Sequence, residues 1–303
     1  MTARHKTIAW IGGLVLVVIV VGVGVLSLAI RPKFVVKAIF GDPIEKKTTA
    51  ARAHFKLGYE LEERGKRDEA IGEYRKAIEL KPDFAEALEN LAGALHSQAN
   101  EAGAIIAFKK ARDAVRDDKA RVKMIDSWIA EAEKSAGLVA RLSALAQGTE
   151  RPKDATEAFE IATICRRLKR YALSARFVEQ AFRDDPKLAD NSLAGHRYNA
   201  ACSTALAASG QGIDDEKPNE QEKIRLRKQT LEWLKADLKM WSAQLKNSDR
   251  KTFVSQILRH WKNDPDLAAL RVESSLKSLP EDEQTAWRAF WKDVDDAIEA
   301  ARK

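Results

Sequence analysis

The chain has 303 residues, which is enough for one large domain or two small ones. Charged residues make up 32% of it and aromatic residues 7%, with 15 glycines, 8 prolines and 2 cysteines, which excludes a disordered, collagen-like or disulfide-rich protein. Much of the net charge of +7 lies near the N-terminus, and elsewhere Lys and Arg alternate with Asp and Glu as on a solvated helix surface, so we expect no binding to nucleic acid.

The first feature along the chain is an uncharged run over residues 8–30, which reads IAWIGGLVLVVIVVGVGVLSLAI. As a helix rising ~1.5 Å per residue it would span ~34 Å, enough to cross a hydrocarbon core of ~30 Å. Ser27-Leu28-Ala29 could serve as a cleavage site, but the run exceeds the ~7–15 apolar residues of a signal-peptide core. We predict an uncleaved transmembrane helix over 8–30, between a basic tail over 1–7 and a basic linker over 31–47.

The sequence leaves the membrane orientation and the state of the cysteines open. More Lys and Arg follow the apolar run than precede it, which favours a cytoplasmic C-terminal part. A short basic tail before a first hydrophobic segment is also typical of exported domains. Cys165 and Cys202 lie in apolar helical patterns, and we interpret them as small core residues. A disulfide between them could form only in an exported domain.

The middle of the chain matches itself when it is shifted by 34 residues. The matching pairs are Leu57 and Leu91, Gly58 and Ala92, Leu61 and Leu95, Ala70 and Ala104, Tyr74 and Phe108, and Ala77 and Ala111. A 34-residue period with this alternation of large and small residues is typical of the tetratricopeptide repeat, a pair of packed helices. Small residues at Gly58 and Ala70 would let the two helices approach closely, and Pro82 would end the first unit.

A third unit follows at the same internal spacing and is closed by Pro186. Its matching residues are Ile161, Ala162, Tyr171, Ser174, Val178 and Ala181. Ile161 lies 104 residues after Leu57, which is three 34-residue periods plus two residues. One more unit should therefore lie between the second and third, and residues 119–152 are predicted to form it as a degenerate helical pair with a small insertion. A further first helix is expected from His196.

The C-terminal part is predicted to be a helical cap rich in tryptophan. A long helix is expected over 220–246, a shorter one around Trp261, and a last helix from Pro280. The last helix carries an apolar stripe of Trp287, Phe290, Trp291, Val294 and Ile298. Because a solenoid must cover its last open face, we expect these aromatic residues to pack in a core, with an aromatic ligand site as the alternative. The predicted fold class is all-α, with a repeat solenoid over 48–209 and the cap over 210–303.

Six segments after Ser127 read, in order, WIAEAEKSAGLVARL, RYALSARFVEQAFRDDPKLAD, AGHRYNAACSTALAASGQG, RKQTLEWLKADLKMW, LRHWKNDPDLAALR and LPEDEQTAWRAFWKDVDDAI. This part of the chain resembles the C-terminal tetratricopeptide-repeat region of planctomycete-type serine/threonine protein kinases. No kinase domain accompanies it: Gly12-Gly13 lies in the apolar run, and His196-Arg197-Tyr198 lacks the aspartate of a catalytic loop. The resemblance implies a regulatory or adaptor role without the enzyme. With the predicted transmembrane helix, we expect a single-pass protein of a bacterial inner membrane.

The sequence shows no pattern for catalysis, a cofactor or a metal ion. The histidines are scattered, and none pairs at metal-ligand spacing: His5, His54, His96, His196 and His260. The HExxH, CxxC, GxSxG and P-loop patterns are missing as well. We therefore expect a protein that is not an enzyme and has no catalytic, cofactor-binding or metal-binding residues.

The candidate site is the concave groove that the first helices of such repeats line. Residues outside the packing stripe would point into it, namely Arg52, Phe55, Tyr59, Glu62 and Glu63 in the first unit and Glu86, Glu89, Gly93, His96 and Ser97 in the second. We predict partner binding by Arg52, Phe55, Tyr59, Glu62, Glu86 and Glu89. Phe55 and Tyr59 would be exposed aromatic anchors, and the glutamates would repel a partner's C-terminal carboxylate. The alternative is a surface without a binding role.

Together these features predict a membrane-anchored scaffold or adaptor that binds a protein or peptide in the groove. The alternatives are a regulatory partner of a separate serine/threonine kinase, a self-associating structural protein of the cell envelope, and an enzyme of unrecognised type. The sequence does not specify the partner, the biological process or the oligomeric state.

Overall fold

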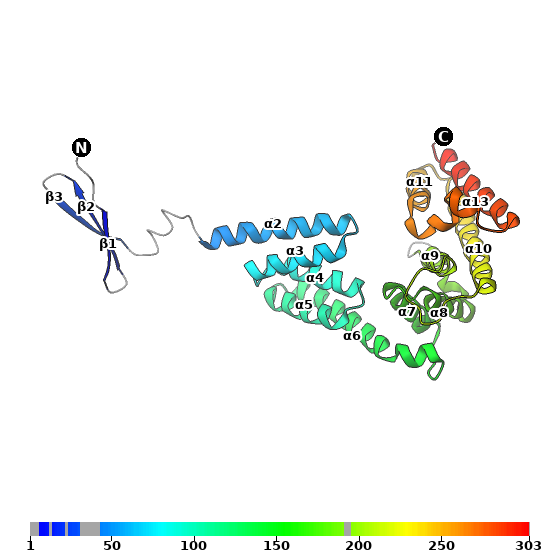
Figure 1. The fold of residues 1–303 in the computed structure, drawn as a ribbon, viewed down its shortest axis with the longest axis horizontal. Coiled ribbons are helices and arrows are strands. Elements are labelled where there is room, and N and C mark those ends of the chain that lie inside the picture. The colour runs from blue at the N-terminus through cyan, green and yellow to red at the C-terminus, as the bar shows by residue number, and fades with distance from the viewer. Residues whose placement is uncertain (1–5, 12–13, 22–23, 31–42, 191–194, 303) are drawn as a thin grey trace. The chain divides into compact units, whose positions relative to one another are not determined.

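The computed structural model describes residues 6–11, 14–21, 24–30, 43–190 and 195–302 (Figure 1). The chain divides into two compact units, which we call unit 1 (residues 1–96 with 102–130) and unit 2 (residues 97–101 with 131–303).

The apolar run near the N-terminus forms strands. The strands β1 (Lys6–Ile11), β2 (Leu14–Val21) and β3 (Gly24–Ile30) make an antiparallel sheet of order β1-β2-β3, with Ile11 opposite Leu14. Valine and isoleucine dominate the run, and their β-branched side chains suit strands better than helices.

The transmembrane helix predicted over 8–30 is therefore wrong, and so is the single-pass membrane localisation that rested on it. Across the described residues no helix combines the length and the apolar character needed to span a bilayer. Most of the predicted basic tail and linker, residues 1–5 and 31–42, lies outside the described residues.

Unit 1 contains the repeat helices α2 (Pro43–Glu63), α3 (Arg67–Leu80), α4 (Ala85–Ser97) and α5 (Glu101–Ala114). Small residues make the closest contacts, as predicted. Ala70 and Ala104 are both fully buried. A Cβ atom added to Gly58 would lie 2.6 Å from Cε1 of Tyr74 and 3.3 Å from the carbonyl oxygen of Ala70, so only glycine fits there.

The helix α6 (Lys119–Gln147) replaces the predicted degenerate pair with a single helix of 29 residues. Its buried residues change face along the helix: Ile125 and Ile129 pack in a core cluster of unit 1, whereas Leu138 and Leu142, about 220° further around the helix axis, pack in a core cluster of unit 2. The segment holds no proline, and Gly137 stays helical because a lone glycine costs only ~1 kcal/mol.

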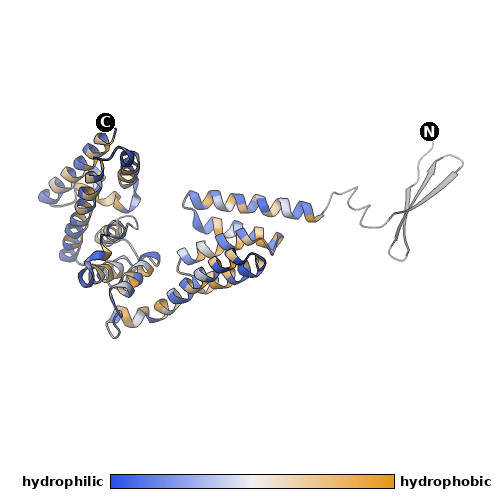
Figure 2. Ribbon diagram, turned by 180° about the vertical axis from the view of Figure 1, so that it is seen from behind, coloured by the Kyte–Doolittle hydropathy of each residue, from blue (hydrophilic) through white to orange (hydrophobic). Residues whose placement is uncertain are grey.

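After α6, the described residues of unit 2 form α7 (Ala155–Arg167), α8 (Tyr171–Asp184), η1 (Pro186–Leu188), α9 (His196–Ala208), α10 (Glu220–Gln244), α11 (Ser248–Asn263), η2 (Pro265–Leu270), α12 (Glu273–Leu276) and α13 (Glu281–Ala300). Polar side chains cap several of them. Asp154 and Asn219 accept the backbone N–H groups of Glu157 and Glu222, which fixes the starts of α7 and α10. In Figure 2 the helices alternate hydrophobic and hydrophilic residues, as expected where one side of each helix is packed.

The predicted aromatic stripe of the last helix is packed in the largest core cluster of unit 2. Trp287 is 1% exposed and Trp291 is 5% exposed, and the indole N–H of Trp291 donates to the carbonyl of Leu270 at 2.7 Å. The expectation of core packing is confirmed. Cys165 and Cys202 are likewise buried and are not joined by a disulfide.

Candidate functional site

Three helices of unit 1 meet at the hydroxyl group of Tyr74. This residue, on α3, is fully buried, and its hydroxyl donates to Oε2 of Glu62 on α2 at 2.8 Å. The amide Nδ2 of Asn90 on α4 donates to the same hydroxyl oxygen at 3.5 Å. Burial first, and then the hydrogen bond to Glu62, raise the pKa of Tyr74 well above its usual range. The phenol therefore stays protonated and holds the carboxylate in place.

Tyr59 lies three residues before Glu62 in the C-terminal part of α2, so the two side chains share one face of the helix. Tyr59 is 52% exposed although it is a large aromatic residue. We call Tyr59, Glu62, Tyr74 and Asn90 the groove site. It offers an exposed aromatic ring next to a carboxylate of fixed orientation.

Phe55 was predicted to be a second exposed anchor, and this is wrong. Its ring is half-buried between Phe84, at a centroid distance of 5.1 Å, and Tyr74, at 6.0 Å. Phe55 thus supports the core under the groove site. The predicted groove residues Arg52 and Glu63, by contrast, are exposed.

The glutamates of α4 do not form an unopposed acidic surface. Nε of Arg121, in the first turn of α6, donates to Glu89 at 2.8 Å, and Nη1 lies 3.6 Å from Glu86. The hydrogen bond that Arg121 donates to Glu89 raises the pKa of Arg121, so this side chain keeps its positive charge beside the two glutamates. Gly93 and His96, the other groove residues predicted on α4 within unit 1, are half-buried.

The prediction from the sequence brought Tyr59 and Glu62 together but missed three residues of this surface: Tyr74, Asn90 and Arg121. A signal for Tyr74 was present, because the second repeat has Phe108 at the same position. A tyrosine in place of a buried phenylalanine indicates that its hydroxyl group has a partner.

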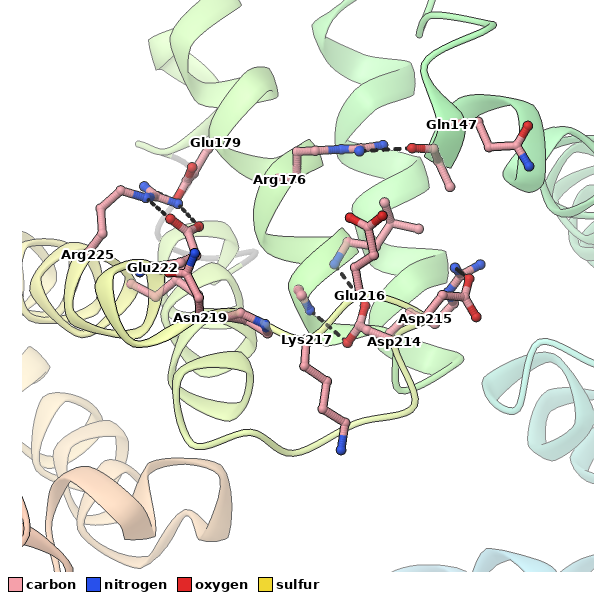
Figure 3. Close-up of a pocket in the computed structure, with 16 residues that line it drawn as sticks. Gln147, Arg176, Glu179, Asp214, Asp215, Glu216, Lys217, Asn219, Glu222 and Arg225 are labelled. Atoms are coloured by element: carbon pink, nitrogen blue, oxygen red, sulfur yellow. Dashed lines mark hydrogen bonds and ion pairs between the residues drawn. The ribbon is translucent and has the colours of Figure 1, made fainter.

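Figure 3 shows a charged cavity of unit 2, of about 650 Å³, between α8, the start of α10 and the connection that precedes α10. Asp214 accepts two backbone N–H groups in the first turn of α8, each at 3.0 Å. Arg225 pairs with Glu179 and Glu222, and Arg176 donates to two backbone carbonyls at the end of α6. These charges hold helix ends and the connection in place.

A smaller cavity of about 240 Å³ lies between α7, α8 and α9 of unit 2. Its lining residues include Phe159, Ala162, Thr163, Arg166, Val178, His196, Asn199 and Ala200. The ring of Phe159 packs on that of His196 at a centroid distance of 4.3 Å, and Arg166 donates to Asn199 at 3.3 Å. The first helices of unit 2 therefore also line a hollow with an apolar floor and polar sides.

One family model matches a segment of the chain. Residues 58–98 match the family model described as "TPR repeat", the tetratricopeptide repeat. This segment contains Tyr59, Glu62, Tyr74 and Asn90, so the groove site lies within a tetratricopeptide-repeat segment.

Two solved structures are similar to the chain at low identity. One is YrrB, described as a TPR protein with an unusual peptide-binding site, at 12% identity over 84% of this chain and 95% of that chain, with a TM-score of 0.23. The other is the APC/C hetero-tetramer Cut9-Hcn1, at 14% identity over 90% of this chain and 46% of that chain, with a TM-score of 0.29. No curated protein matches the chain.

Proposed function

We propose that the chain is a protein-interaction module and that the groove site binds a segment of another protein. The observation that carries this proposal is the exposure of Tyr59. A half-exposed tyrosine beside a carboxylate of fixed orientation supplies both an apolar anchor and a directional polar contact. The repeat segment around it supports the same conclusion, since grooves of this repeat are lined by such first-helix residues.

The charges of the groove indicate the chemistry of the bound segment. Glu62 uses one carboxylate oxygen for Tyr74, which leaves Oε1 for a ligand cation. Glu86 and Glu89 share Arg121, so together they contribute one net negative charge. We expect an extended or helical segment with an apolar residue on Tyr59, flanked by Lys or Arg that faces Glu62. Such charges speed association and favour the correct partner more than they raise affinity.

The test uses the full chain and a displayed library of random peptides. An enriched peptide is titrated against the wild type, Tyr59→Ala and the matched control Leu57→Ala. Leu57 is 45% exposed and lies on the same helix, two residues before Tyr59. Its side chain therefore points about 200° away from that of Tyr59 around the helix axis, outside the groove site. If Tyr59 is the anchor, Tyr59→Ala weakens binding by at least ~2 kcal/mol and Leu57→Ala leaves it unchanged. Equal affinity for all three proteins would place recognition elsewhere.

A further inference from the structure

A cluster of potential metal ligands lies where α9, the end of α11 and η2 meet in unit 2. The ligand atoms of Cys202, Asp264 and Asp266 all lie within 4.8 Å of one another. Nε2 of His260, one turn before Asp264, is 3.5 Å from Oδ2 of Asp264. We propose that these four side chains form a binding site for a divalent transition-metal ion of the zinc type.

Two distances to Oδ2 of Asp264 agree with tetrahedral coordination. Metal–sulfur and metal–oxygen bonds of ~2.3 and ~2.1 Å at a tetrahedral angle place the two ligand atoms about 3.6 Å apart. Sγ of Cys202 lies 3.9 Å from Oδ2 of Asp264. A nitrogen and an oxygen ligand would lie about 3.4 Å apart, against the 3.5 Å between His260 and Asp264. Cys202, Asp264 and Asp266 already lie within 4.8 Å of one another, and a rotation of the exposed His260 side chain toward them would complete the coordination sphere.

The charges around the cluster favour a dication. Asp264 and Asp266 are two carboxylates, and Arg166 offsets one of them through a bond of 2.8 Å from Nη2 to Oδ2 of Asp266. Metal binding releases the proton of Cys202 to solvent as the sulfur–metal bond forms. The three negative charges of Cys202, Asp264 and Asp266 would then equal the two positive charges of the metal ion plus the one of Arg166, so the site would be neutral.

Neighbouring groups would hold the ligands in position. The hydroxyl of Tyr198 donates to Oδ2 of Asp264 at 2.6 Å, and its ring stacks on Trp261 at 5.2 Å. Partners of this kind orient metal-bound carboxylates in known sites. Asp264 is 8% exposed and Cys202 is fully buried, whereas the side chain of His260 is 65% exposed. The ion would therefore enter past the histidine.

The competing interpretation is a structural network in which Asp264 only caps η2. Its Oδ1 accepts the backbone N–H of Asp266 at 2.8 Å. In that case Cys202 keeps its proton, because burial and the adjacent Asp264 raise the pKa of the thiol. The two interpretations differ in one observable, which is the formation of a metal–thiolate bond.

The experiment titrates Co²⁺ and then Zn²⁺ into the full chain, prepared without a histidine tag and stripped of metal by a chelator. We expect a near-ultraviolet thiolate-to-cobalt charge-transfer band with intense visible bands of tetrahedral cobalt, and their loss when Zn²⁺ is added. Cys202→Ser should abolish the charge-transfer band. Cys165→Ser is the matched control, because that thiol is also fully buried and should leave the spectrum unchanged.

His260→Ala keeps the test valid if Cys202→Ser fails to fold, because this side chain is exposed. We expect it to weaken Zn²⁺ binding by at least about 10-fold, the loss seen even for an outer-shell partner. A wild type without the charge-transfer band, or equal Zn²⁺ affinity of the wild type and His260→Ala, would overturn the proposal and leave a structural network only.

Discussion

Removing the hydroxyl group of either Tyr74, which is buried, or Tyr198, which is half-buried, should destabilise the protein by different amounts. Tyr74 donates to Glu62 at 2.8 Å in unit 1, and Tyr198 donates to Asp264 at 2.6 Å in unit 2. Replacing either tyrosine by phenylalanine keeps the ring and its packing. The difference between the two variants therefore reports on the surroundings of the carboxylate that loses its donor.

The structure sets the expected magnitudes. A hydrogen bond to a charged group contributes ~1.5–3 kcal/mol, and the cost of losing it rises when the group left behind is buried. Glu62 is half-buried, so water can replace the lost donor, and Tyr74→Phe should cost ~1.5 kcal/mol or less. Asp264 is only 8% exposed, so Tyr198→Phe should cost ~3 kcal/mol.

Because the chain divides into two compact units, a single global unfolding free energy is not well defined and each variant needs a local measurement of stability. Hydrogen exchange followed by mass spectrometry at increasing urea concentration gives the opening free energy of peptides from α3 and from α9. We expect Tyr74→Phe to weaken protection in α3 only and Tyr198→Phe to weaken protection in α9 more strongly. A larger decrease in opening free energy for Tyr74→Phe than for Tyr198→Phe would show that burial of the accepting carboxylate does not control the loss of stability.

Three further changes test the packing and the electrostatics. Ala104→Leu should overpack a fully buried contact and lower the free energy of unfolding by ~1–3 kcal/mol. Trp291→Ala should leave a cavity and lower it by ~3–5 kcal/mol. Unchanged melting temperatures of both variants would show that the helices pack differently. The hydrogen bond from Lys76, followed by that from His54, lowers the pKa of Glu73 below its ordinary value of 4.5. The stability that Glu73 contributes is therefore present above about pH 4.5 and is lost as the pH falls through its lowered pKa. Glu73→Gln should weaken the acid dependence of unfolding of unit 1, and an unaltered pH profile would contradict this assignment.

The sequence by itself determined the repeat architecture, because closely packed helices need small residues at regular positions along the chain. The 34-residue period and the small residues at Gly58 and Ala70 predicted helix pairs in contact, and the structure places both residues in that contact. The apolar stripe of the last helix, with Trp287 and Trp291, likewise predicted a core. In each case the spacing along one helix fixes which side chains share a face.

The tertiary structure alone decided the conformation of the apolar run, the exposure of single side chains and the composition of the sites. A run that is apolar apart from Ser27 shows no hydrophobic period, so residues 8–30 could not be assigned to a helix or to strands from hydropathy. Exposure depends on neighbouring helices, which is why Tyr59 is open while Phe55, four residues earlier, is covered by Phe84. The groove site combines side chains from α2, α3 and α4, and the proposed metal site combines α9 with the end of α11. Such groups meet only after folding, because no spacing along a single helix brings them together.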